Sequence, residues 1–82
     1  CHRECLLSFS WYADLDEARQ SVICEMCFNL GLARLKAFKK MLKAVEMGNF
    51  AIASQEMLTS KWAMQVGNRA KTLADAMKRG IV

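Results

Sequence analysis

The side chains in this sequence with the strongest potential for chemistry are its four cysteines and its single histidine. Three residues separate Cys1 from Cys5, two separate Cys24 from Cys27, and His2 lies beside the first pair. Paired spacings of this kind are typical of structural zinc sites, in which four thiolate or imidazole ligands converge tetrahedrally. Cys24 and Cys27, however, fall within an uninterrupted helical period, whereas zinc-binding pairs usually occupy a tight turn. We therefore expect reduced, structural thiols, a surface histidine, no metal and no cofactor.

The carboxylates do not form a recognisable catalytic set. Glycoside hydrolysis needs two carboxyl groups facing each other across a cleft, and the sequence places no pair in that way. Asp14 and Glu17 are better explained as helix caps. His2 lies too near the chain end to assign it to a serine or cysteine nucleophile. We expect no enzymatic activity from this chain alone. The eight acidic residues are Glu4, Asp14, Asp16, Glu17, Glu25, Glu46, Glu56 and Asp75.

A basic stripe lies in the middle of a chain whose net charge is +4. Such a stripe is most often the solvated face of a surface helix, and this is the interpretation we favour. A basic amphipathic helix can also bind nucleic acid, an anionic membrane surface or an acidic partner, and an anionic polymer such as peptidoglycan would be attracted as well. The charge alone selects none of these functions. The stripe consists of Arg34, Lys36, Lys39, Lys40 and Lys43.

These residues must be positioned by a small helical domain. The chain has 82 residues, enough for one domain, and 54% of them are apolar, which is too many for a disordered chain. A membrane span needs about 20 consecutive apolar residues, and no stretch provides them. Proline is absent, and only four glycines are present. This composition predicts an all-α fold. Periodicity and helix breaks along the chain predict a compact bundle of five to six helices around one buried central helix.

The central helix is predicted between Asp14 and Gly31. Apolar residues recur every three to four positions from Leu15 to Leu30, as in a helix with one buried stripe. We expect Asp14 to cap its N-terminus in a capping box with Glu17. We expect Gly31 to end it, because glycine tolerates the left-handed conformation that closes many helices.

The other helices follow from periodicity and from the positions of glycine and of capping residues. Residues 1–9 are predicted as a short helical tail, and residues 32–47 as one helix that buries Leu35, Phe38, Leu42 and Val45. A helix over residues 50–58 is capped by Asn49, a short one with Trp62 begins after Ser60, and the last runs from the cap Asn68 to Gly80. Trp62 is expected to anchor the core, with Arg69 donating hydrogen bonds to carbonyls at a helix end.

An ordered set of motifs resembles the C-terminal lobe of the phage-type lysozymes related to the T-even phage enzyme. The resemblance extends over roughly residues 6–80, and its most specific segment is SKWAMQVGNRAK, residues 60–71. The other matching positions are Phe28-Asn29-Leu30-Gly31, Leu35, Phe38 and Asn49-Phe50.

This resemblance implies a division of labour between two lobes. Residues 1–9 would be the tail of a helix connecting the lobes, and residues 10–82 the C-terminal lobe. The catalytic glutamate of the family and its aspartate and threonine partners belong to the N-terminal lobe, so none can be assigned here. The expected partners are that missing lobe and a peptidoglycan glycan strand, and nucleic acid is the less favoured alternative. The resemblance further implies an endolysin, a phage lysozyme that is made in the cytoplasm of the bacterial host and acts on the cell wall after release.

The resemblance also implies which residues contact substrate. By position, the wall of the glycan cleft falls on Phe28, Asn29, Met41 and Glu56. Phe28 and Asn29 keep the aromatic and amide character of the family, whereas small polar or amide residues are expected in place of Met41 and Glu56. Arg34 also differs from the glycine that many relatives carry. The alternative is a non-enzymatic module whose basic helix binds nucleic acid or a partner protein.

Overall fold

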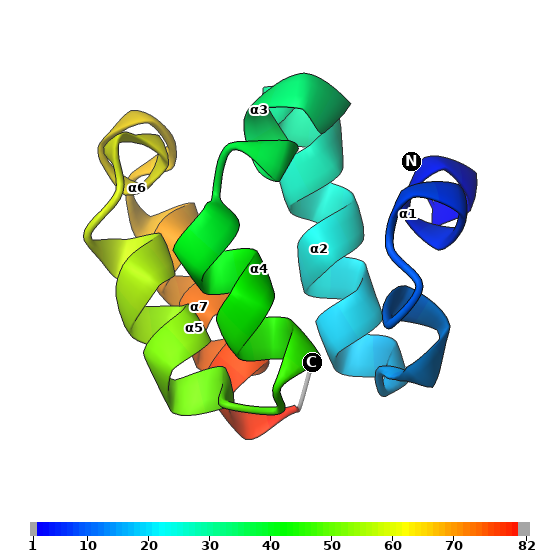
Figure 1. The fold of residues 1–82 in the computed structure, drawn as a ribbon. Helices are drawn as coiled ribbons and strands as arrows, with labels where there is room; N and C mark the ends of the chain where they lie inside the picture. Colours follow the sequence, from blue (N-terminus) through cyan, green and yellow to red (C-terminus); the bar gives the residue numbers. More distant parts are fainter. Residues whose placement is uncertain (1, 81–82) are drawn as a thin grey trace.

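The computed structural model describes residues 2–80, and all of their regular structure is helical, which confirms the predicted all-α class (Figure 1). The expectations for residue 1 and for residues 81–82 lie outside this range. No helix within it is long and apolar enough to cross a membrane. The described elements are α1 (His2–Ser8), the 3-10 helix η1 (Tyr12–Asp14), α2 (Glu17–Leu30), α3 (Leu32–Lys36), α4 (Lys39–Glu46), α5 (Phe50–Leu58), α6 (Lys61–Val66) and α7 (Asn68–Arg79).

Helix α2 is the central element, as predicted. It packs against α1, α3 and α7, and in Figure 1 it runs between α1 on one side and the helices α4, α5 and α7 on the other. Ile23 and Met26 have no exposed surface, and Val22 and Cys27 are also buried. All these residues belong to one continuous apolar cluster. One core therefore holds the whole described chain, and α2 contributes to it along most of its length.

The N-terminus of α2 is capped by Asp16 and not by Asp14, so that prediction was wrong. The Asp16 carboxylate accepts the backbone N–H of Arg19 at 3.1 Å, from an extended residue with φ −63° and ψ 160°. A cap needs such a non-helical conformation. Asp14 is instead the last residue of η1, and Glu17, as the first residue of α2, cannot form the predicted capping box.

The helix predicted over residues 32–47 is two helices, because the chain turns at Ala37 and Phe38. Phe38 has a non-helical ψ of 58°, and α4 starts after it. The turn has a packing reason: α3 packs on α2 and buries Leu35, whereas α4 packs on α5 and buries Met41 and Val45. A straight helix could not bury both sets of residues. Phe38 and Leu42, predicted as core residues, are half-buried.

Of the three other predicted caps, Ser60 is confirmed, whereas Asn49 and Asn68 do not act as caps. Ser60 does cap α6, since its hydroxyl accepts the backbone N–H of Ala63. Asn49 precedes α5 but makes no capping hydrogen bond, and Asn68 is already the first residue of α7. Gly31 does end α2, with a φ of 83° that favours glycine.

Arg19 links the start of α2 to the end of α7. Its Nε donates to the carbonyl of Met77 at 2.6 Å and its Nη2 to the carbonyl of Lys78 at 3.0 Å. Its Nη1 pairs with Asp16 at 2.9 Å, and the guanidinium lies 3.6 Å from the centre of the Phe50 ring. The last carbonyls of a helix lack intrahelical donors and carry partial negative charge, so a cation is favourable there. Arg19 therefore joins three helices.

A second arginine joins the same two helices nearer the other end of α2. Arg69 was expected to donate to carbonyls at a helix end, but its Nε and Nη2 instead pair with the two carboxylate oxygens of Glu25. The paired carboxylate raises the pKa of Arg69 above its ordinary value. Both side chains are partly exposed, and such pairs contribute little to stability. The contact links the first turn of α7 to α2.

Candidate functional site

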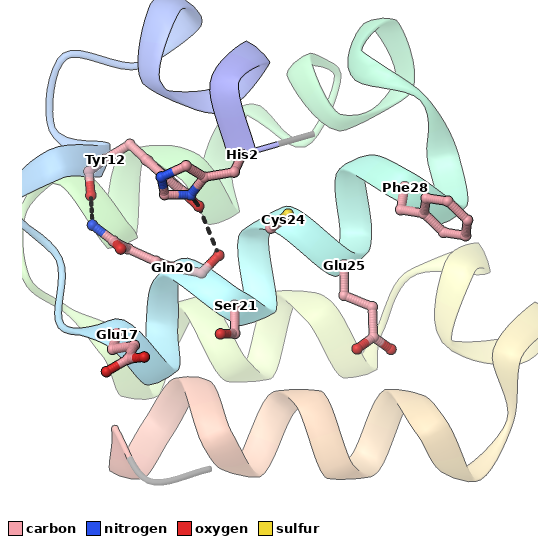
Figure 2. Close-up of a pocket in the computed structure, with 8 residues that line it drawn as sticks. All are labelled: His2, Tyr12, Glu17, Gln20, Ser21, Cys24, Glu25 and Phe28. Atoms are coloured by element: carbon pink, nitrogen blue, oxygen red, sulfur yellow. Dashed lines mark hydrogen bonds between the residues drawn. The ribbon is translucent and has the colours of Figure 1, made fainter.

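A pocket of about 650 Å³ runs along the face of α2 that α1 flanks, and we call it the α2 pocket (Figure 2). Its α2 residues are spaced by three or four positions, the spacing that puts side chains on one face of a helix. Figure 2 shows α2 carrying most of the lining, with His2 and Tyr12 contributed from α1 and η1. The lining residues are His2, Tyr12, Glu17, Gln20, Ser21, Cys24, Glu25 and Phe28.

Hydrogen bonds tie one end of this pocket together. The Tyr12 hydroxyl donates to the Gln20 carbonyl at 3.1 Å, and Gln20 Nε2 donates back to the Tyr12 carbonyl at 3.0 Å. The Tyr12 oxygen also lies 2.9 Å from His2 Nδ1, in a hydrogen bond whose donor is set by the tautomer of the imidazole. Burial raises the pKa of Tyr12 to about 12. These contacts hold α1 and η1 on α2.

The two carboxylates of the α2 pocket are not placed for glycoside hydrolysis. Glu17 and Glu25 lie eight residues apart on one helix, and therefore about 12 Å apart along its axis. Catalytic pairs in glycosidases lie about 5–9.5 Å apart. Glu25 is also engaged by Arg69. Within residues 2–80 the pocket thus offers a binding surface, without an acid and base pair for bond cleavage.

Phe28 and Asn29, the first two predicted glycan contacts, lie in the last turn of α2. Phe28 is 78% exposed and forms one edge of the α2 pocket, where Figure 2 shows its ring beyond Glu25. Asn29 is exposed beside it. The two side chains are therefore free to contact a ligand, from a helix end that Gly31 closes.

Met41 and Glu56, the other two predicted contacts, lie together in a different pocket. This pocket has a volume of about 400 Å³ and includes Phe38, Lys39 and Lys40 in its lining. Met41 is only 1% exposed, and Glu56 is half-buried. Burial of Met41 in the core leaves little of its side chain for a ligand. Phe28 and Asn29 therefore lie together in the last turn of α2, and Met41 and Glu56 lie together in this second pocket. None of the pockets described above is lined by all four residues.

The cysteines of the described chain are free thiols without a metal-binding arrangement. Cys5 and Cys27 are buried, and Cys24 is half-buried. Burial, followed by the proximity of Cys27, raises the pKa of Cys5 to about 12. No group of three or more His, Cys, Asp or Glu side chains within residues 2–80 could hold a metal ion. Cys1, part of the paired spacing, lies outside this range.

A third pocket lies where α2, α3 and α6 meet. Trp62 is 2% exposed, which confirms it as a core anchor, but its indole Nε1–H is buried without a hydrogen-bond partner. The pocket beside it has a volume of about 380 Å³, with Arg34, Lys61 and Gln65 among its lining residues. The sequence predicted a short helix with Trp62 after Ser60, but it could not show that Arg34 lines the same pocket.

Comparisons with known proteins give one consistent result. The chain is 33% identical over 69 residues to the probable T4-type lysozyme 1 of Dictyostelium discoideum, an alignment that covers 84% of this chain and 41% of that protein. It is 30% identical over 69 residues to the probable T4-type lysozyme 2 of the same organism, with the same coverage. No family model and no solved structure gives a significant match. The chain thus spans about two fifths of the length of these relatives.

Proposed function

This chain is related to the T4-type lysozymes, and we propose that it forms one wall of a glycan-binding cleft in a longer protein that cleaves the β-1,4 bonds of peptidoglycan. The relationship, which extends over 84% of the chain, supports a lysozyme-like function. The proposed site of action is the bacterial cell wall. Both relatives come from Dictyostelium discoideum, so a phage origin and a role as an endolysin stay predictions.

The observation that carries this proposal is the exposure of Phe28 on a fixed helix end. An aromatic ring that is 78% exposed gains little of the stabilisation that burial of its apolar surface in the core would provide. Ligand sites combine such apolar surfaces with a few polar groups that set orientation, and the Asn29 amide is adjacent. Phe28 would stack on the apolar face of a sugar ring, and Asn29 would hydrogen-bond an acetamido or hydroxyl group.

The chain itself would supply binding and not the catalytic carboxylates. Glu17 and Glu25 lie on one helix, with backbones about 12 Å apart along its axis, and do not face each other across a cleft; Glu25 also pairs with Arg69. The acid and its partners would come from a separate N-terminal lobe of the parent protein. We therefore expect no cleavage of peptidoglycan by this chain alone.

Titration with chitotetraose, followed by two-dimensional amide NMR, tests the proposal. We expect millimolar binding with shifts centred on the last turn of α2, and Phe28→Ala or Asn29→Ala should weaken it by about tenfold. Met64→Ala is the matched control for Phe28, because Met64 is 85% exposed on α6 and lines neither the α2 pocket nor the pocket of Met41 and Glu56. Unchanged affinity in both α2 variants, or shifts confined to other helices, would refute the proposed wall.

A second candidate function rests on the lysines of α4. Lys39, Lys40 and Lys43 form no ion pair within the described chain, and all three line a groove of about 700 Å³ that includes Met47 and Ile52. This surface could bind nucleic acid or an acidic partner protein. Retention on DNA that falls steeply with salt, and that is lost on reversing the charges of Lys39 and Lys40, would favour this function over the glycan wall.

A further inference from the structure

The pocket beside Trp62 combines three features that are unusual together. Its indole Nε1–H is buried without an acceptor, although buried polar groups are nearly always hydrogen-bonded. Its rim carries two cations, Arg34 and Lys61, and neither forms an ion pair within the described chain. Its walls include the apolar side chains of Leu30 and Phe38. The residue with this unpartnered donor therefore lines the same pocket as two cationic side chains that form no ion pair within the described chain.

We propose that this pocket is a binding site for a small organic acid. The carboxylate would lie between the guanidinium of Arg34 and the ammonium of Lys61, and one of its oxygens would accept the Trp62 N–H. The apolar body of the acid would lie against Leu30 and Phe38, in a volume of about 380 Å³ that suits a small molecule. The exposed amide of Gln65 is within the lining and can donate a further hydrogen bond.

The chemistry of the site selects an anion over a neutral ligand. Arg34, Lys61, Gln65 and Trp62 all offer hydrogen-bond donors, and no acidic residue lines the pocket. Hydrogen bonds from cationic donors to a carboxylate are shorter and stronger than neutral ones. Because the Trp62 nitrogen has almost no exposed area, the side chains that cover it must move as the ligand enters. Exposed side chains change rotamer within nanoseconds, so this movement is not a barrier.

The site does not depend on the proposed glycan wall, because none of its lining residues is Phe28, Asn29, Met41 or Glu56. The acid could be free in solution, or it could be a carboxylate on the peptide of a cell-wall fragment. The shared chemistry is a carboxylate attached to an apolar or amide-bearing body. The two sources are separated below by the choice of probe.

The experiment follows the indole N–H resonances of the chain labelled with nitrogen-15. Benzoate represents a free acid, and muramyl dipeptide represents a wall fragment. Benzamide and the amidated muramyl dipeptide are their neutral controls. We expect a saturable shift of the Trp62 indole resonance with at least one acid, no shift with its amide, and little change at Trp11, which serves as the internal reference.

Charge variants then test the role of the rim. Arg34→Gln combined with Lys61→Gln should weaken acid binding by about tenfold, because both attractive charges are lost. Lys78→Gln, an exposed lysine of α7, is the control and should have no effect. Both rim residues are exposed, so these variants should fold.

Three results would overturn the inference: no saturable shift of Trp62 with either acid, an equal shift with the amides, or acid binding that survives the double substitution. A shift with muramyl dipeptide but not with benzoate would support the site and identify the source as a wall peptide. The opposite result would support the site and identify a free acid. Loss of chitotetraose binding would leave all these outcomes unaffected, so the two proposals fail separately.

Discussion

Replacing Arg19 by methionine would measure how much of the fold depends on the link between α2 and α7. The variant keeps an apolar side chain but loses the hydrogen bonds to the carbonyls of Met77 and Lys78 and the cation over the Phe50 ring. Hydrogen bonds that involve a charged group contribute about 1.5–3 kcal/mol each, and a cation over an aromatic ring about 0.5–1 kcal/mol at exposed sites.

Solvent reduces these contributions only in part, because the Arg19 side chain is 15% exposed. Water will hydrate some of the carbonyl oxygens that the substitution frees, so the sum is an upper limit. We expect the free energy of unfolding to fall by about 3 kcal/mol, a large share of the total for a domain of this size. Arg19→Lys should have an intermediate effect, since it keeps one charge but not the planar fork of donors.

Urea denaturation followed by circular dichroism would provide the measurement. Arg79→Met is the matched control, because it removes an exposed ion pair with Asp75 and should cost less than about 0.5 kcal/mol. A loss for Arg19→Met no larger than that of the control would refute the assignment of Arg19 as a link between helices.

Three further predictions concern the contact between the start of α2 and the end of α7, and the buried thiol of Cys5. Burial raises the pKa of Asp16, but the hydrogen bonds from Arg19 outweigh burial, and the net effect is a lowered pKa. The ionised carboxylate therefore stabilises the fold at pH values above its ordinary pKa of 3.8, and this stabilisation is lost as the pH falls through the lowered pKa. The free energy of unfolding of Asp16→Asn should depend less on pH in that range. Gly80→Ala should cost more than Gly48→Ala in urea melts. Both impose strain of about 1–3 kcal/mol at positive φ. At Gly80 the new Cβ would also lie 2.8 Å from Arg19 Nη1, and Arg19 can shift away only by weakening its hydrogen bonds to Met77 and Lys78; an equal cost would contradict this reasoning. Burial raises the pKa of Cys5 to about 12, so iodoacetamide at neutral pH should leave Cys5 unmodified until the chain unfolds. Mass spectrometry would measure the modification. Modification before unfolding would mean that this thiol is accessible.

Local patterns in the sequence were sufficient for most of the helices, but not for the break at Phe38 or for the contacts between helices. Helix α2 was predictable because its buried residues repeat every three to four positions and Gly31 follows them. The choice between Asp14 and Asp16 as its cap was not predictable, since both are good capping residues and only the extended conformation of Asp16 decides.

The break at Phe38 and the role of Arg19 depend on the tertiary structure. Residues 32–47 have a continuous helical pattern, and the turn arises because α3 and α4 pack on different helices. Arg19 binds carbonyls 58 and 59 residues away, which no local motif encodes. Of the candidate site, the sequence identified Phe28 and Asn29 by resemblance, and whether they bind a glycan stays a prediction.

The position of α7 has a consequence for how the chain is made. Both α2 and α5 pack on α7, and the Arg19 carbonyl partners belong to its last turn. During synthesis, α2 and α5 leave the ribosome before α7, so part of their apolar surface stays uncovered until α7 emerges. A ribosome that stalls before that point would hold a nascent chain prone to aggregation, whatever its finished form binds.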